Sequence, residues 1–339
     1  MTDTTTGVLL CIAAGVVSGS FTLPMKFMRG WAWENTWFVW TACALIALPI
    51  AAAMLTLPNL GEIYADAGAG IVAAVAVLGS GWGVSQMLFG LAVKQVGMTI
   101  AFSVVTGMSV VLGSAVPLMS LPAGQILSPR GLGTLSGVAL VVAAMGICAL
   151  AGRRREAEQS GTTMQHKPRY RYGLLLTLGS GLGAAAINFA IAFGAPLLES
   201  AQRHGSDPLW ATNAIWLPLM LAGAVPNLAF CAYLMHRNDT GGCFAGARTL
   251  LNWLRATVMA GCWFGSISLY GLAVGKLGSW GATLGWPLFT SLIVITASGC
   301  GIVAGEWGRA GWGSMRTQIC GMSVLIVAVF VLATAIQPA

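Results

Sequence analysis

The chain contains the stretch MLFGLAVKQVG at residues 87–97, and 181 positions later it contains SLYGLAVGKLG at residues 268–278. The correspondence extends backward along the chain, because Trp82 matches Trp263 at the same separation. Chance similarity between helices rich in Gly, Ala and Leu is the alternative explanation for so short a match. We interpret the match as an internal repeat, because the organisation of the whole chain repeats in the same way.

The starts of the two halves correspond as well. GVLLCIAAG at 7–15 aligns with GLLLTLGSG at 173–181, at a separation of 166. An insertion of 15 residues between the sixth and eighth apolar runs reconciles the two separations. Pairs of glycines four residues apart, such as Gly79 and Gly83, predict close approach of helices, which drives helix association in lipid.

The composition of the chain is that of a membrane protein. Of its 339 residues 57% are hydrophobic and 8% are charged, and the mean hydropathy is +0.80. A soluble globular protein carries about 25% charged residues, so this chain has too few to cover a surface facing water. The net charge of +7 comes from Lys and Arg in short loops, which indicates contact with a membrane surface and not with nucleic acid.

Ten apolar runs are long enough to span a bilayer, which takes roughly 20 mostly apolar residues. The polar stretch at 153–172, a basic cytoplasmic linker, divides the chain into halves of five runs each, 1–152 and 173–339. Because five is odd, two such halves must cross the membrane in opposite directions. The sequence thus predicts an all-α integral membrane protein with ten transmembrane helices, arranged as two inverted-topology five-helix repeats as in many secondary transporters. The runs lie at 7–25, 36–57, 70–92, 98–120, 131–151, 173–197, 209–235, 252–273, 279–304 and 314–336.

Positive charge is distributed unevenly over the loops. With the N-terminus outside, fourteen of the 17 Lys and Arg residues fall in inner loops, and only Arg130, Arg203 and Lys276 fall in outer ones. Short cytoplasmic loops carry an excess of Lys and Arg. We therefore expect both termini to lie outside the cytoplasm.

Several segments resemble one family of transporters. LPMKFMRGWAWENTW at 23–37, FGLAVKQVGM at 89–98, SDPLW at 206–210, PNLAFC at 226–231 and GEWGRAG at 305–311 are similar, in order and spacing, to segments of the bacterial L-rhamnose–proton symporter family. That family belongs to the drug/metabolite transporter superfamily. The resemblance covers nearly the whole chain, and it implies a multi-pass protein of the bacterial inner membrane that takes up L-rhamnose or a similar deoxy sugar by proton symport.

A sugar site needs hydrogen-bonding groups for the hydroxyls and a flat aromatic surface for the apolar C–H face. Polar side chains inside spans are unfavourable unless they face the bundle interior, so the few present are informative. Trp82, Gln86 and Phe89 share one helical face, and the second half carries a matching face. The predicted substrate-binding residues are Trp82, Gln86, Phe89, Asn188, Trp263, Ser266, Tyr270 and Trp286.

These residues also have plainer explanations. A serine within a span usually bonds to a carbonyl of its own helix. Tryptophans near span ends usually form an interfacial belt, which accounts for Trp33 and Trp37 better than for the deeper Trp82. The amides of Gln86 and Asn188 are harder to satisfy alone, which favours a place along the transport pathway.

No acid or histidine lies in the middle of a predicted span. A proton relay normally uses a titratable group whose ionisation is tuned by burial. The candidates for proton coupling are therefore at span ends, and they are Lys26, Glu34, Asp207 and Glu306. Ion pairing, a helix N-cap at Asp207 or a solvated loop charge explains these residues equally well. Proton coupling accordingly rests on the family resemblance.

Two other functions are weighed against a symporter. An exporter of metabolites or drugs shares the fold, although a site for cationic drugs favours a buried carboxylate. A membrane-embedded enzyme needs a nucleophile–base pair or metal ligands, and the spans contain neither a His–carboxylate pair nor an HExxH motif. The eight cysteines form no CxxC pattern, so no cofactor or metal is expected. The expected partners are a small-molecule sugar, a proton and membrane lipid.

Overall fold

The computed structural model describes residues 3–96, 98–119, 122–160, 170–246, 249–305, 307–308 and 310–336. Throughout these residues the regular secondary structure is helical, and nine stretches of them are long and apolar enough to cross a membrane. One of the nine, Thr249–Val303, contains two long helices joined by a short turn. Helices satisfy their own backbone hydrogen bonds, as a lipid environment demands. The prediction of an all-helical, multi-pass membrane protein is confirmed.

The described residues up to Ser160 form eight α-helices, a 3₁₀-helix and a π-helix. The last predicted span of this part is longer than expected, since α8 continues through the basic residues as far as Ser160. Arg, Glu, Ala and Gln in this segment are good helix formers. The elements are α1 Asp3–Ser20, η1 Leu23–Phe27, α2 Trp33–Thr41, the π-helix η2 Ala42–Ala47, α3 Leu48–Thr56, α4 Leu60–Ala67, α5 Ala69–Val96, α6 Met98–Met119, α7 Ala123–Ile126 and α8 Pro129–Ser160.

The residues from Tyr170 onward contain a broken helix that the sequence predicted as one span. It is interrupted next to Ala185 and again at Gly194, where Pro196 follows in the first turn of the next helix. The elements are α9 Tyr170–Ala184, α10 Ala186–Phe193, α11 Ala195–Arg203, α12 Asn213–Asn238, η4 Gly241–Ala245, α13 Thr249–Leu277, η5 Gly278–Trp280, α14 Gly281–Val303 and α15 Trp312–Ile336.

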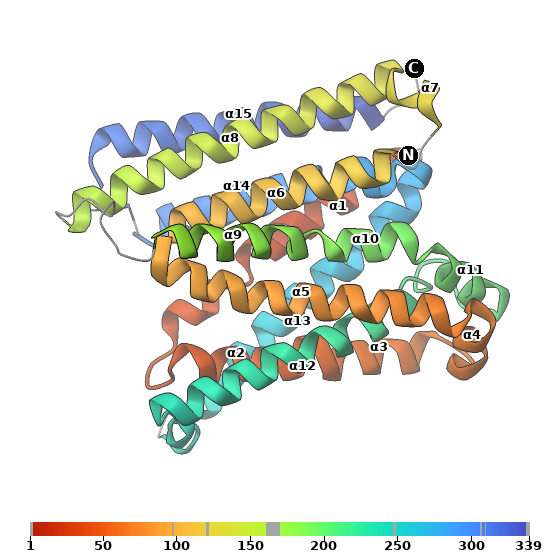
Figure 1. Cartoon of the computed structure of the whole chain (residues 1–339), viewed down its shortest axis with the longest axis horizontal. Helices are drawn as coiled ribbons and strands as arrows, with labels where there is room; N and C mark the ends of the chain where they lie inside the picture. The colour runs from red at the N-terminus through yellow and green to blue at the C-terminus, as the bar shows by residue number, and fades with distance from the viewer. Residues whose placement is uncertain are drawn as a thin grey trace.

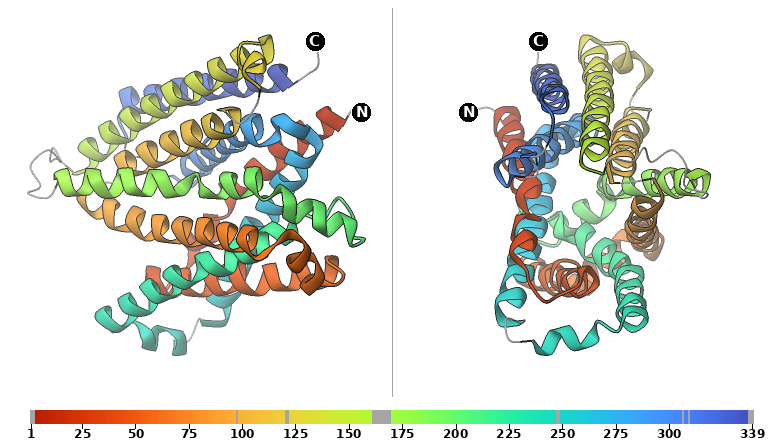
Figure 2. Two further views of the ribbon diagram at one scale, coloured as in Figure 1. Left: turned by 45° about the vertical axis from the view of Figure 1, so that its right-hand side comes forward. Right: turned by 90° about the vertical axis from the view of Figure 1, so that its left-hand side faces the viewer.

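The axes of the long helices are roughly aligned, with chain directions that differ from helix to helix, and both chain termini lie at the same end of the molecule (Figure 1). We call this the terminus end. At the opposite end α8 finishes and α9 begins, and we call this the linker end. The pair α8 and α15 packs together at one edge of the bundle, away from α2 and α12, as two further views show (Figure 2).

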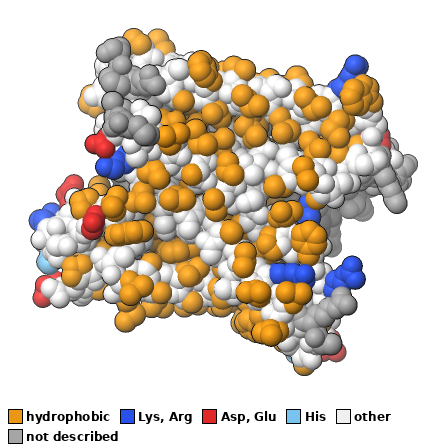
Figure 3. All heavy atoms as spheres, turned by 180° about the vertical axis from the view of Figure 1, so that it is seen from behind, with side chains coloured by type: hydrophobic (Ala, Val, Ile, Leu, Met, Phe, Trp, Pro, Cys, Tyr) orange, Lys and Arg blue, Asp and Glu red, His pale blue; other side chains and the backbone are white. Residues whose placement is uncertain are grey.

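On the face of the molecule that Figure 3 shows, hydrophobic side chains are spread over the surface between the two ends, and the charged side chains lie near the ends. Leu175 on α9, Val225 on α12 and Phe330 on α15 are 67%, 67% and 69% exposed, respectively. So many exposed large hydrophobic residues would be unfavourable in water. The surface therefore fits a bilayer, with the helices crossing it from end to end.

Small residues let some helices approach closely, as the sequence predicted. A Cβ atom on Gly79 or Gly83 of α5 would overlap the backbone of α12 at Leu219 and Gly223. The glycine spacing does not always mark a contact, because nothing lies near a Cβ built on Gly261. Apart from this contact, α5 also packs against α9, while α13 packs against α1 and α2.

Candidate functional site

Tryptophans from three helices meet inside the bundle. The rings of Trp82 on α5 and Trp263 on α13 stack, with centroids 5.5 Å apart and planes 22° apart. Trp40 on α2 meets Trp263 edge to face, at 5.1 Å and 74°. The three side chains are 4%, 7% and 2% exposed, respectively. We call these three residues the tryptophan cluster; it brings two of the predicted binding residues, Trp82 and Trp263, into direct contact.

A row of indole rings connects the tryptophan cluster to the linker end. Trp37 stacks on Trp40 with centroids 4.6 Å apart, and Trp33 stacks on Trp37 at 5.3 Å. The spacing of these residues along α2 places them on one helical face. Trp33, at the start of α2, is 41% exposed. A continuous aromatic surface thus leads from the surface to the interior.

A second group of predicted residues forms a closed hydrogen-bonded network. The Asn188 Nδ2 on α10 donates to the carbonyl oxygens of Gly113 on α6, at 2.5 Å, and Ala282 on α14, at 2.9 Å. The Tyr270 hydroxyl on α13 donates to Asn188 Oδ1. Both amide hydrogens and the amide oxygen of Asn188 are therefore engaged by the protein itself. In this conformation the network joins four helices and does not present Asn188 to a ligand.

Trp286 belongs to the same region. Its ring lies 5.6 Å from that of Tyr270, and its Nε1–H donates to the backbone oxygen of Ser109 on α6, at 3.0 Å. Phe289 stacks on Tyr270 with centroids 4.9 Å apart. Trp286 and Tyr270 thus hold α6, α13 and α14 together, and every polar atom that they place here has a partner.

The remaining predicted residues are scattered. The Ser266 hydroxyl donates to the carbonyl oxygen of Trp263, one turn earlier, so it bonds to its own helix. Phe89 turns toward α6, where it contacts Phe102 at a centroid distance of 6.5 Å. Gln86 is half-buried on α5. The predicted shared face of α5 is therefore divided among different neighbours, and Trp82 alone of these three joins the tryptophan cluster.

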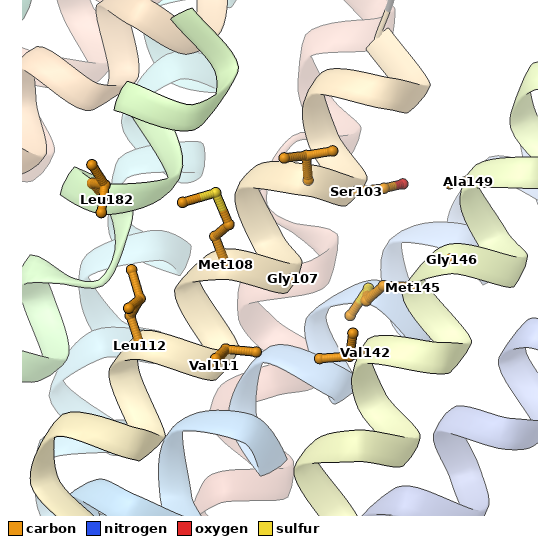
Figure 4. A pocket seen from close by; sticks show the side chains of 11 residues that line it. Ser103, Gly107, Met108, Val111, Leu112, Val142, Met145, Gly146, Ala149 and Leu182 are labelled. Carbon is orange, nitrogen blue, oxygen red and sulfur yellow. The ribbon is translucent and has the colours of Figure 1, made fainter. Parts of the chain in front are cut away.

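A groove of about 490 Å³ lies elsewhere, between α6, α8 and the tip of Leu182 on α9 (Figure 4). Met108 and Leu112 line one side, and Val142 and Met145 line the other. Its lining is apolar apart from the hydroxyl of Ser103, and none of the predicted binding residues reaches it. It lacks the hydrogen-bonding groups that a sugar needs.

Glu34 is the candidate acid that the structure buries. At 6% exposure, its Oε1 accepts hydrogen bonds from Asn238 Nδ2 and Thr240 Oγ1, both at 2.9 Å. The neighbouring Asn35 donates through Nδ2 to the carbonyl oxygen of Thr240, also at 2.9 Å. The start of α2 is thereby fastened to the end of α12 at the linker end. We call this set of contacts the Glu34 clasp.

The other candidates for proton coupling have different surroundings. Asp207 is exposed, and its Oδ1 accepts the backbone N–H of Leu209 at 2.8 Å, which makes it a turn-forming residue. Lys26 is exposed in η1. Glu306 lies outside the described residues. Of Lys26, Glu34 and Asp207, Glu34 is the one whose side chain is buried.

A second carboxylate bridges the terminus end. Asp66 accepts hydrogen bonds from Ser200 Oγ at 2.8 Å and from Arg203 Nη2 at 2.7 Å, which links α4 to α11. The Arg203 guanidinium and the Ser200 hydroxyl hold the pKa of the Asp66 carboxyl below its ordinary value. Nearby, Asn213 Nδ2 donates to Thr56 Oγ1 at 2.9 Å. We call the contacts of Asp66 the Asp66 clasp.

The sequence did not single out Trp40 of the tryptophan cluster or Asp66 of the Asp66 clasp. Trp40 lies near the start of an apolar run and reads as an interfacial or structural residue. The spacing of Trp33, Trp37 and Trp40 on one helical face was the signal that could have found Trp40. Asp66 has no comparable signal, because its partners are more than a hundred residues away.

Among the described residues no group of three or more His, Cys, Asp or Glu side chains is placed to hold a metal ion. All eight cysteines are free thiols. A buried aromatic surface reached along a row of indoles, in a bundle of long apolar helices bridged at both ends, defines a multi-pass membrane protein with an aromatic interior.

Comparison with known proteins specifies the family. The model of the L-rhamnose-proton symport protein (RhaT) family matches residues 2–337. The L-rhamnose-proton symporter of Escherichia coli is 26% identical over 331 residues, which cover 96% of each chain. That of Mannheimia succiniciproducens is 24% identical over 329 residues, which cover 95% of each chain. The chain belongs to the L-rhamnose-proton symporter family, and the resemblance identified from its sequence is confirmed.

Proposed function

We propose that this protein is a secondary active transporter of the bacterial inner membrane that takes up L-rhamnose or a similar deoxy sugar together with a proton. Its family membership and the names of its relatives support transport and not an enzymatic reaction. The observation that carries the proposal for this chain is the stacking of Trp82 on Trp263 inside the bundle. Flat aromatic faces suit the apolar C–H face of a sugar.

An inverted repeat is part of this proposal, and equivalent contacts support it. A Cβ on Gly7 would touch Leu277, and a Cβ on Gly173 would touch Val96. The separations of 166 and 181 found in the sequence convert one contact into the other. In the same way, the approach of Gly15 to Phe289 corresponds to that of Gly181 to Met108.

The arrangement of whole helices agrees with these contacts. The packing of α5 against α9 has its counterpart in the packing of α13 against α1, and α6 packs against α9 as α14 packs against α1. α1 runs away from the terminus end, whereas α9 starts at the linker end and runs the opposite way (Figure 1). We therefore propose ten membrane-spanning helices in two halves, 1–152 and 173–339, related by a pseudo-twofold axis. Trp82 and Trp263 occupy equivalent positions and lie beside that axis.

The two clasps support alternating access as part of this proposal. The Glu34 clasp joins α2 to α12 at the linker end, and the Asp66 clasp joins α4 to α11 at the terminus end. Each clasp connects one half of the chain to the other. Opening one clasp while the other stays closed would expose the interior to one side of the membrane at a time, as secondary transporters require.

Glu34 is the residue that we propose to couple the sugar to the proton. Its carboxylate is buried, and it accepts hydrogen bonds from Asn238 and Thr240 of the other half of the chain. Protonation would weaken these acceptor contacts and release the linker end. On the proposed orientation, with both termini outside, the linker end faces the cytoplasm.

Transport in proteoliposomes tests the proposal. Purified protein should accumulate labelled L-rhamnose when the outside is more acidic than the inside, and sugar added without a gradient should make the outer solution more alkaline. A protonophore should abolish accumulation but not exchange of internal for external sugar. Accumulation that follows a sodium gradient and ignores pH would contradict proton symport. A lack of both transport and binding with L-rhamnose and related deoxy sugars would contradict the proposed substrate.

A further inference from the structure

Two consecutive residues of α2 carry buried polar atoms with no hydrogen-bond partner among the described residues. They are Nε1 of Trp40 and Oγ1 of Thr41, in side chains that are 2% and 0% exposed, respectively. Native proteins satisfy the large majority of their buried polar groups, because an unpaired one costs free energy. Trp286 shows the usual arrangement, since its indole N–H donates to Ser109. The pair therefore points to a partner that is not part of the chain.

The local backbone is unusual at the same place. Trp40 and Thr41 come directly before the π-helix η2, Ala42–Ala47. π-helices are rare, and they occur frequently at functional sites. Because successive residues of an α-helix are turned by about 100°, the wider turn changes how Trp40 is oriented relative to α3. The π-helix thus changes the angular offset between Trp40 and the residues of α3.

The surroundings of Trp40 match the two-sided chemistry of a sugar. Its ring meets that of Trp263 at 74°, which forms a corner between two indoles. Trp37 supports the ring from one side at 4.6 Å, and Phe21 lies 6.0 Å away. An apolar C–H face can rest on one ring of such a corner while a hydroxyl bonds to the N–H at the edge of the other.

We propose that Trp40 and Thr41 form the polar part of the sugar site. The Trp40 Nε1–H donates to one ring hydroxyl, the Thr41 hydroxyl bonds to a second, and the apolar face of the sugar packs on Trp263. This inference rests on the proposed function and deepens it, because it assigns specificity to two residues of α2. It also gives the interior polar groups two different roles. Trp40 and Thr41 bind the sugar, whereas Asn188 and Tyr270 hydrogen-bond to each other and hold helices together.

Removing the indole N–H tests the assignment. Trp40→Phe keeps an aromatic ring but no donor, and equilibrium binding of L-rhamnose to the purified protein should weaken by about 3- to 10-fold, as expected for one hydrogen bond. Trp216→Phe is the matched control. Trp216 on α12 is also fully buried and its Nε1 also lacks a partner among the described residues, but it lies outside the tryptophan cluster. It should bind L-rhamnose like the wild type.

Sugar analogues sharpen the test. The second measurement uses L-rhamnose derivatives that each lack one ring hydroxyl. One derivative should bind the wild type more weakly than L-rhamnose does, whereas Trp40→Phe should bind that derivative and L-rhamnose equally well. Thr41→Val should likewise bind L-rhamnose and a different derivative equally well. If Trp40→Phe does not fold, replacing Trp40 with benzothienylalanine removes only the N–H at nearly constant shape.

The outcomes separate this inference from the proposed function. Wild-type protein that binds L-rhamnose, with unchanged affinity in both the Trp40 and Thr41 variants, overturns the assignment but leaves the symporter intact. Equal weakening by Trp40→Phe and Trp216→Phe also overturns it, because the effect would then be one of packing. Wild-type protein that binds neither L-rhamnose nor related deoxy sugars overturns both proposals.

Discussion

The two ends of the bundle are each bridged by a carboxylate, but in different surroundings. At the linker end Glu34 is 6% exposed and accepts hydrogen bonds from Asn238 and Thr240. At the terminus end the Asp66 side chain is 40% exposed and pairs with Arg203 at 2.7 Å. A buried acceptor is costly to remove, whereas an exposed ion pair contributes little and is screened by salt. The linker end should therefore depend much more strongly on its carboxylate.

Glu34→Ala should have the largest effect. Two donors lose a charged acceptor, so the closed linker end should be destabilised by about 1.5–3 kcal/mol, which corresponds to at least a tenfold shift toward the open form. Cys231 reports this change, because it is 1% exposed and lies on α12 two turns before Asn238 of the Glu34 clasp. With the other cysteines replaced, maleimide labelling of Cys231 should become at least about tenfold faster.

The control for this measurement is Glu62→Ala. Glu62 is an exposed acid of α4 at the terminus end, and its removal should leave the labelling of Cys231 at the wild-type rate. Unchanged labelling in Glu34→Ala would show that the linker end stays closed without the carboxylate.

Glu34→Gln should have a narrower effect. The amide keeps the size of the side chain but cannot carry a proton, so accumulation of L-rhamnose driven by a pH gradient should fall by about tenfold or more. Exchange of internal for external sugar, which needs no net proton movement, should stay within about threefold of the wild type. Measuring both in the same proteoliposomes distinguishes lost coupling from lost transport, and pH-driven accumulation at the wild-type level would remove Glu34 from the proton path.

Asp66→Asn should have a small effect. The lost pair is partly exposed, with side-chain exposures of 56% for Arg203 and 40% for Asp66. We expect the midpoint of thermal unfolding to fall by less than about 2 °C at low salt, and by less still at high salt. Arg203→Gln should behave in the same way. If Asp66→Asn lowers the unfolding midpoint as much as Glu34→Ala does in the same measurement, the two ends do not differ as proposed.

The smallest effect should be the pH dependence of the stability that Asp66 contributes. Arg203 and Ser200 hold the pKa of Asp66 below its ordinary value of 3.8. A lowered folded-state pKa stabilises the protein above the unfolded-state pKa, and this contribution disappears as the pH falls through the folded-state value. The difference in unfolding midpoint between wild type and Asp66→Asn should thus be constant near neutral pH and vanish only below pH 3.8. A difference that already disappears at neutral pH would contradict this assignment.

The apolar runs of the sequence predicted the long helices well, because a helix that spans a bilayer must have both a minimum length and an apolar composition. The last run, expected at 314–336, is helix α15, Trp312–Ile336. The π-helix η2 could not be predicted in this way, since a shift of backbone hydrogen bonds leaves the composition of Ala42–Ala47 unchanged. The break at Ala185 was equally hidden, and nearby Asn188 bonds to helices that are distant in the sequence.

The candidate site was predicted only in part. The repeat placed Trp82 and Trp263 at equivalent positions, and the structure brings them into contact. Residue type alone could not distinguish Asn188, which the protein satisfies internally, from Trp40, which it leaves without a described partner. That distinction depends on which carbonyl groups the folded chain places nearby, and spacing within a single helix carries no information about them.

The contact between Trp82 and Trp263 also has a consequence for descent. On the proposed inverted repeat, an ancestor with a single repeat would have formed an antiparallel dimer, and this tryptophan would have met its own copy across the dimer axis. A single mutation would then have changed both sides of the proposed sugar site. Fusion of two copies into one gene would have let the two sides diverge, and in the present sequence Gln86 corresponds to Ile267 and Phe89 to Tyr270.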